Sequence, residues 1–315
     1  VRVPNAMDGV PHLTQKPVGP GESFVYEFVA PDAGTFWYHP HQRSFEQVDR
    51  GLSGVIIVDE PQPPKVDRDI IWMLDDWRLD GAGQITPDFG SMPDTMHSGR
   101  IGSWLTVNGK PPENLTVRTG ERIRLRLINV ANARIFALGF QGHASQVIAL
   151  DGQPVEPHAP EFGRIVLGPG MRADLIFDMT GPPGGKFSVN DNFYPGLEYK
   201  LLDIVYAGGA PLRVKPLESS IRLPANPLAE PDLAQAERHE IVFSGGMMGG
   251  MMGGGMMGGG MMGGRMIWAV NGVAAPDHIT TPILTLPRNS THILALNNDT
   301  AWHHPIHLHG HVFRV

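Results

Sequence analysis

Glycine and proline constrain this chain more than any other feature. The 315 residues include 39 glycines and 29 prolines, well above average usage, and both residue types interrupt helices. Long helices are therefore disfavoured, and a fold rich in turns is expected.

Short runs between the turns have the alternation of β-strands, in which successive side chains point to opposite faces. In 122–127, arginine alternates with isoleucine or leucine, which predicts an apolar face on a core and an arginine face in water. Residues 24–28 show the same two-faced pattern, whereas 54–58 and 175–177 are short apolar runs typical of buried strands. Only 232–240 has a helical pattern. The sequence thus predicts an all-β chain of Greek-key sandwich or barrel modules.

Turn signals separate these runs. Asp-Gly and Asn-Gly steps favour positive φ angles and therefore mark tight turns. They occur at Asp8–Gly9, Asp80–Gly81, Asn108–Gly109, Asp151–Gly152 and Asn271–Gly272.

Two proline-rich stretches, 60–64 and 207–216, are candidate linkers between domains. They divide the chain into 1–60, 61–210 and 211–315. Because a complete β-sandwich needs about 100 residues, we expect 1–60 to be the C-terminal part of one.

Composition excludes several kinds of chemistry. The chain contains no cysteine, so it has no disulfide, zinc–thiolate site, iron–sulfur cluster or cysteine nucleophile. Metal chemistry must then use His, Asp, Glu or Met. A net charge of −7 argues against nucleic acid or an anionic membrane surface as a partner. No apolar run is long enough to span a bilayer.

A low-complexity tract at 245–266 consists of paired methionines separated by glycines. The pairs are Met247, Met248, Met251, Met252, Met256, Met257, Met261 and Met262. So much glycine predicts a mobile loop rather than a core. Soft thioethers select Cu(I), so Cu(I) binding is one hypothesis, and a loop without a metal role is the alternative.

The first of two histidine clusters lies within 36–41. His39 and His41 are two residues apart, so on a strand both imidazoles project from one face, about 6–7 Å apart. This spacing suits ligands of neighbouring metal ions better than a single chelate. Pro40 lacks a backbone donor, which places the pair at a strand edge or end.

The second cluster, 302–311, contains five histidines. His307 and His309 repeat the spacing of the first pair. His304 precedes them by three residues, with a proline between, and is expected to point away and serve a different metal. A lone histidine such as His292 is usually a surface or core residue. Imidazole suits copper, zinc, iron and nickel alike, and a nonspecific metal-binding strand stays open as an alternative.

The two clusters resemble the second and third copper-binding signatures of the multicopper oxidases, the laccase-like family. The resemblance continues through 50–58, 124–134 and 269–272 and so covers nearly the whole chain. It implies tandem cupredoxin-like Greek-key β-sandwich domains, of which the first and third are incomplete. It also implies copper of three kinds, a blue type 1 ion and a trinuclear cluster of type 2 and binuclear type 3 ions.

The resemblance implies ligand roles by position in the motifs. The implied ligands are His39, His41 and His309 for type 3 copper, His307 for type 2 copper and His304 for type 1 copper. It gives no ligand role to His303 or His311.

Asp8 matches an acidic residue that members of this family place near the type 2 copper. A carboxylate there can deliver protons, which is general acid–base chemistry. The alternative is that Asp8 only forms an Asp-Gly turn.

The family has two further signatures, an HxHG pair expected before the first cluster and a His-Cys-His run expected after the second, and neither is found at those places in this sequence. A blue copper site needs a cysteine thiolate. We therefore expect an internal fragment of a longer enzyme, redox-silent as the 315 residues alone.

For the whole enzyme, the resemblance implies a copper-dependent oxidoreductase. It would oxidise phenolic or aromatic substrates or Cu(I) one electron at a time and reduce O2 to water. Export to the periplasm or out of the cell is expected of the family. One alternative is a non-catalytic copper-binding or copper-tolerance protein that uses the histidine pairs and the methionine tract. Another is a structural β scaffold that has lost its copper sites.

Overall fold

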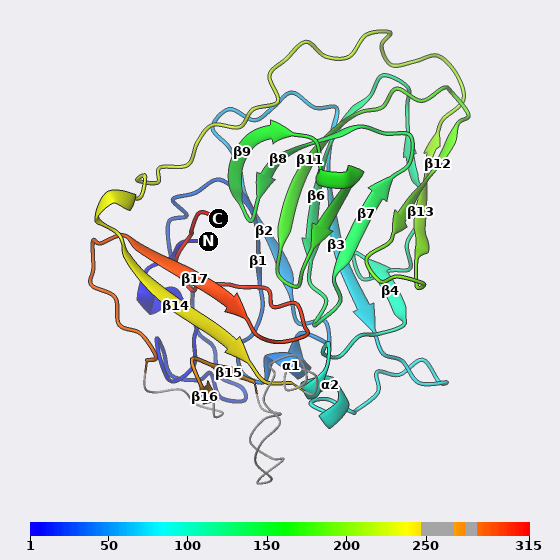
Figure 1. Ribbon diagram of the computed structural model, residues 1–315. Helices are drawn as coiled ribbons and strands as arrows, with labels where there is room; N and C mark the ends of the chain where they lie inside the picture. The colour runs from blue at the N-terminus through cyan, green and yellow to red at the C-terminus, as the bar shows by residue number, and fades with distance from the viewer. Residues whose placement is uncertain (247–267, 275–281) are drawn as a thin grey trace.

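The computed structural model describes residues 1–246, 268–274 and 282–315, and they form short β-strands joined by loops (Figure 1). The predicted all-β class is confirmed. The helices found in these ranges are single turns: η1 (Asn5–Met7), α1 (Ser44–Gln47), α2 (Met92–Met96), η2 (Glu161–Gly163) and η3 (Leu233–Gln235).

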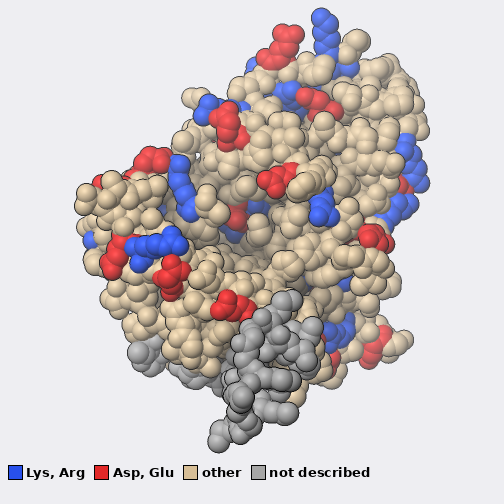
Figure 2. Space-filling view, viewed as in Figure 1, with Lys and Arg blue, Asp and Glu red and all other residues tan. Residues whose placement is uncertain are grey.

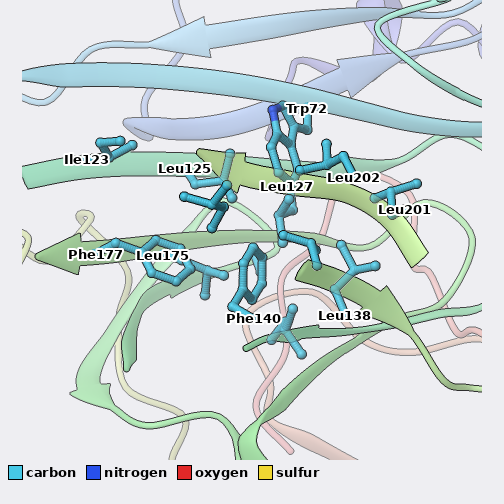
Figure 3. Close-up of a cluster of buried hydrophobic side chains, with 14 of the residues drawn as sticks. Trp72, Ile123, Leu125, Leu127, Leu138, Phe140, Leu175, Phe177, Leu201 and Leu202 are labelled. Atoms are coloured by element: carbon cyan, nitrogen blue, oxygen red, sulfur yellow. The ribbon is translucent and has the colours of Figure 1, made fainter. Parts of the chain in front are cut away.

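Two sheets form a sandwich in the middle of the chain. The six-stranded sheet has the order β4 (Trp104–Val107), β3 (Arg68–Trp77), β6 (Arg122–Asn129), β11 (Arg172–Asp178), β8 (Ser145–Leu150) and β9 (Gln153–His158). The five-stranded sheet has the order β10 (Arg164–Leu167), β7 (Phe136–Phe140), β12 (Lys186–Asp191), β13 (Tyr199–Tyr206) and β5 (Leu115–Val117). Alternate side chains of both sheets meet in one core, where Leu125 and Leu127 of β6 face Leu138 and Phe140 of β7 (Figure 3).

Two smaller sheets lie beside this sandwich (Figure 1). β1 (Gly34–Tyr38) and β2 (Gly54–Val58) form an antiparallel pair. The four-stranded sheet has the order β16 (Val273–Ala274), β15 (Ala269–Val270), β14 (Glu237–Ser244) and β17 (His292–Asn298), and β14 runs parallel to β17.

Two of the predicted elements are wrong. Residues 24–28 pair with no strand in the part of the chain that the structure describes, and the Phe24 and Tyr26 rings instead contact each other at 4.7 Å. The helix predicted at 232–240 is a single turn followed by β14. Seven backbone pairings with β17 favour the strand there, and tertiary pairing of this kind overrides a weak helical preference.

Most of the predicted turns form. Both residues have positive φ at Asn108–Gly109, Asp151–Gly152 and Asn271–Gly272. At Asp8–Gly9 only the glycine does. Asp80–Gly81 turns differently, because the Asp80 carboxylate accepts hydrogen bonds from the backbone N–H groups of Ala82 and Gln84.

The arginine face of β6 is buried, which corrects the prediction that it meets water. Arg122, Arg124 and Arg126 are 5%, 1% and 3% exposed. β1 contacts both β6 and β11, so the segment 34–60 covers this face. Alternation in a sequence shows which side chains share a face, but not what covers that face.

Arg124 lies at the centre of this buried face. Its guanidinium donates to both carboxylate oxygens of Glu60, at 2.9 and 2.6 Å, and to Oδ2 of Asp174, at 2.6 Å from one nitrogen and 3.1 Å from another. Burial opposes ionisation of Glu60, but the hydrogen bonds from Arg124 hold its pKa below the ordinary value. Buried charges persist only when they are paired in this way.

Arg126 extends the network to β1. It donates to both oxygens of Asp69 at 2.8 Å and to the Thr35 hydroxyl at 2.8 Å. The Thr35 hydroxyl in turn donates to Oδ1 of Asp174 at 2.8 Å. The sandwich and β1 therefore share one hydrogen-bonded network.

The chain after β13 returns to the same region. Arg122 donates to the carbonyl oxygen of Leu217 at 2.8 Å. Asn226 exchanges two hydrogen bonds of 3.0 Å with the backbone of Ala33, just before β1. These contacts join the chain after β13 to β6 and to the residue before β1.

Close packing at Gly152 fixes the position of β1 further. Gly152 has φ of 78°, and a Cβ there would lie 2.4 Å from the ring of Phe36 on β1. Phe36 is buried. Only glycine permits both this backbone conformation and this approach.

No helix among the described residues is long and apolar enough to cross a membrane. On the face seen in Figure 2, basic and acidic side chains are intermingled, and neither sign forms a large patch.

Replacing the central arginine tests the buried network. Arg124→Met leaves buried Glu60 without its cation and leaves Asp174 only the longer contact to Arg126 at 3.3 Å. We therefore expect the free energy of unfolding to fall by about 3–5 kcal/mol in urea titrations at pH 7. The control is Arg222→Met, which breaks a pair with Glu156 whose side chains are 69% and 70% exposed. It should cost less than about 1 kcal/mol. Equal small losses in the two variants would contradict the role given to Arg124.

Asp75 on β3 gives the stability a pH dependence. Burial, with the nearby Asp76 and Asp49 carboxylates, raises the pKa of Asp75 from 3.8 to about 8. The folded state therefore holds this proton more tightly than the unfolded state, and the contribution of Asp75 to the free energy of unfolding falls as pH rises from about 4 to about 8. In denaturant titrations across this range, Asp75→Asn should gain stability relative to wild type as pH rises. Profiles that stay parallel would refute this, and exposed Asp59→Asn is the control.

Candidate metal centre

The first histidine pair lies at the end of β1, as the intervening proline predicts. β1 ends at Tyr38, and His39, Pro40 and His41 follow directly. The two imidazole rings lie 4.8 Å apart, centre to centre. The indole of Trp37 stacks on His39 at 4.3 Å and limits its rotation.

The second pair lies in the loop after β17. The rings of His307 and His309 are 5.0 Å apart, and the His309 ring contacts that of His41 edge-on at 4.5 Å. Four imidazoles from opposite ends of the chain therefore form one cluster. We call His39, His41, His307 and His309 the imidazole cluster.

Hydrogen bonds set which ring nitrogen is free. Nδ1 of His39 lies 3.2 Å from the carbonyl oxygen of Pro40. Because a carbonyl can only accept, this Nδ1 carries the hydrogen, and Nε2 keeps its lone pair. Nδ1 of His309 likewise lies 3.2 and 3.3 Å from the two carboxylate oxygens of Asp8. A carboxylate behind a ligand imidazole in this way is typical of metal sites.

Three histidines of the imidazole cluster have lowered pKa values. Burial, followed by the neighbouring imidazoles His309 and His39, lowers the pKa of His41 to about 4. Burial and His309, together with Arg172, lower the pKa of His307 to about 4. Burial also lowers the pKa of His39. Neutral imidazole is the form that binds metals, so these three histidines need no deprotonation at pH 7.

His304 lies apart from the imidazole cluster. Its ring stacks on Phe243 of β14 at 5.6 Å and meets the Trp268 ring edge-on at 5.0 Å. Nε2 of His304 is 2.9 Å from the Thr300 hydroxyl. The expectation that this histidine points away from the pair at 307 and 309 agrees with this geometry.

The remaining predicted residues have other surroundings. The His303 ring contacts Phe193 at 5.4 Å, and Nδ1 of His311 donates to the backbone carbonyl of His309 at 2.7 Å. Asp8 both precedes the turn at Gly9 and contacts His309, so its two alternatives are compatible. The eight methionines at 247–262 lie outside the described residues.

The donors fit copper in the imidazole cluster. Imidazole nitrogen suits copper, zinc, iron and nickel, and four rings with at least two oriented lone pairs can hold more than one such ion. A blue copper site at His304 would need a thiolate, and this sequence supplies none. The residues present therefore fit copper at the imidazole cluster, whereas at His304 they provide one imidazole ligand and no thiolate.

Arg172 was not found from the sequence. Its partly buried guanidinium donates to the carbonyl oxygens of Gly170 and Asp151, both at 2.8 Å, and its charge acts on His307. More than a hundred residues separate it from either histidine motif. Nothing in the local pattern signals this contact.

Comparisons with known proteins also indicate a copper-binding protein. Family models described as multicopper oxidase match residues 1–63, 68–200 and 255–315. The multicopper oxidase MmcO of Mycobacterium tuberculosis is 29% identical over 99% of this chain and 64% of its own length. Laccase-1 of Fomitopsis schrenkii is 28% identical over 99% of this chain and 62% of its own length. The chain thus spans less than two thirds of these relatives.

Solved structures give the same result. A multi-copper oxidase from Pseudomonas thermotolerans is 33% identical, with a TM-score of 0.82 over 98% of this chain and 69% of its own. One from Pseudomonas parafulva is also 33% identical, with a TM-score of 0.78 over 98% and 70%. The chain belongs to the multicopper oxidase family. Members of this family bind copper at type 1, type 2 and binuclear type 3 sites.

Removing the carboxylate behind His309 tests the metal centre. Asp8→Ala frees the His309 ring to rotate and to change tautomer, so Cu²⁺ affinity of the imidazole cluster should fall about 10- to 100-fold. Competition with a chelator of known affinity measures this. Asp59→Ala, an exposed carboxylate on another segment, is the control. An unchanged affinity in Asp8→Ala would show that the contact has no part in binding.

Proposed function

We propose that the whole protein carrying this sequence is a copper-dependent oxidase. It takes electrons one at a time from a phenolic or aromatic substrate, or from Cu(I), and uses four of them to reduce O2 to water. The observation that carries this proposal is the convergence of the two histidine pairs into one imidazole cluster, whose rings lie 4.5–5.0 Å apart. Family membership supports the reaction class.

The residues divide into two groups. His39, His41 and His309 would hold the type 3 copper ions and His307 the type 2 ion, while His304 would hold the type 1 ion. Copper, when bound, supplies the one-electron redox steps and the site for O2. The separation of His304 from the imidazole cluster supports its assignment to a different ion.

The protein's own groups orient the ligands and move protons. Trp37 and the Pro40 carbonyl hold His39 with Nε2 free. Asp8 holds the hydrogen on Nδ1 of His309, and its side chain is 15% exposed. It therefore touches both water and the imidazole cluster, which suits a group that passes protons inward.

Three domains remain our proposal for the chain's organisation. Residues 1–60 would form part of the first domain, 61–210 the second, and 211–315 part of the third. The separate family matches at 1–63, 68–200 and 255–315 support this division. The imidazole cluster would then lie between the first and third domains.

A non-catalytic copper-binding protein is the weaker candidate. The relatives carry the names of oxidases and laccases, and an iron transport multicopper oxidase of Epichloe festucae is 25% identical over 99% of this chain. A role in copper tolerance, and export to the periplasm or out of the cell, also belong to this proposal.

Oxygen uptake tests the oxidase. The copper-loaded whole protein should consume O2 when given a phenol or Cu(I), and His307→Gln should abolish uptake with both. His158→Gln, which alters an exposed histidine of β9, is the matched control and should leave uptake unchanged. A copper-loaded protein that consumes no O2 with either substrate would refute the proposal.

Deleting 247–262 distinguishes the two substrates. If the methionine pairs deliver Cu(I), the deletion should reduce uptake with Cu(I) and leave uptake with phenol unchanged or higher. Equal losses with both would contradict a specific delivery role.

A further inference from the structure

A second group of metal-binding side chains lies on the four-stranded sheet. Glu237 and His239 of β14 and His292 of β17 share one face at the beginning of the parallel pair, where Glu237 lies opposite His292. Nε2 of His239 is 3.0 Å from Nδ1 of His292 and 3.9 Å from Oε2 of Glu237. One ligand atom from each residue lies within 4.8 Å of the other two.

A chain of hydrogen bonds orients His292. The Ser290 hydroxyl donates to the carbonyl oxygen of Pro287 at 2.6 Å, which uses its only hydrogen. The 2.7 Å contact between Ser290 Oγ and His292 Nε2 must then have the imidazole as donor. Nδ1 of His292 therefore carries a lone pair and points toward His239.

The same reasoning shows which ring nitrogen of His239 carries the hydrogen. Since Nδ1 of His292 accepts, Nε2 of His239 donates its hydrogen across the 3.0 Å contact. A divalent ion can replace that hydrogen between the two nitrogens, with His239 changing tautomer. Metal-bound imidazoles commonly donate their other N–H to an oxygen, as His292 does to Ser290.

Spacing and exposure also fit an ion. Zinc and copper bind such donors at about 2.0–2.2 Å, so neighbouring donor atoms lie about 3–3.6 Å apart. Small side-chain rotations bring Glu237 within that range. The His239 side chain is 15% exposed and that of Glu237 is 69% exposed, so one side of the group is fixed and the other is open to water.

We propose that Glu237, His239 and His292 form a binding site for a divalent ion of the zinc or copper type, completed by water. The site is distinct from the proposed copper centres. Phe243, which stacks on His304, lies four residues further along β14 and thus about 13 Å from His239.

The ion would fasten two distant parts of the chain. His239 and His292 are 53 residues apart, on either side of the methionine–glycine tract. An ion bound to both joins the beginnings of β14 and β17, so it should stabilise the folded sheet by binding the folded state alone. Its role is structural and involves no redox step.

Zinc stoichiometry tests this site. After equilibrium dialysis of the 315-residue chain against Zn²⁺, metal analysis should find one ion per chain more in wild type than in His239→Gln/His292→Gln. Zinc bound at the imidazole cluster is common to both proteins and cancels. Zn²⁺ should also raise the Tm more in wild type than in the double variant.

Milder variants keep the test independent of folding. Glu237→Gln alters an exposed side chain, and Ser290→Ala removes only the oxygen behind His292. Each should weaken this one Zn²⁺ ion's binding about 10- to 100-fold. Glu240→Gln, also on β14 but on its opposite face, is the matched control and should bind as wild type does. Equal zinc stoichiometry and affinity in wild type and all these variants would overturn the proposal.

Discussion

The buried guanidinium of Arg124 is the interaction on which the rest of the structure depends. It joins Glu60, which follows β2, to Asp174 of the sandwich, and Arg126 adds Thr35 of β1 to the same network. An ion pair taken out of water costs solvation energy, and only complete pairing offsets that cost. Because every charge in the network must be paired, the 34–60 segment can pack on the sandwich in one position only.

The position of the 34–60 segment determines where the first histidine pair lies. His39 and His41 follow β1 without a gap, so they take their position from Thr35 and Phe36. The second pair is held by a different contact, between Asp8 and His309. The imidazole cluster thus forms where two segments from opposite ends of the chain meet, and the two termini lie near each other in Figure 1.

The sequence predicts elements that depend on local pattern. Alternation predicts β6, short apolar runs predict β2 and part of β11, and Pro40 predicts that the pair of His39 and His41 lies at a strand edge or end. It does not predict what covers a face, so the arginines of β6 were expected in water. The sequence also does not predict which strands pair when they are far apart in the chain. His292 looked like an isolated histidine, and its contact with His239 arises only because β14 runs parallel to β17.

The central claim is that the two histidine pairs bind metal as one centre. Anomalous diffraction at the copper edge, from crystals of the copper-loaded protein, tests it most directly. The account predicts copper peaks within bonding distance of nitrogens from both pairs, His39 or His41 on one side and His307 or His309 on the other. Copper found on only one pair, or on neither, would contradict it.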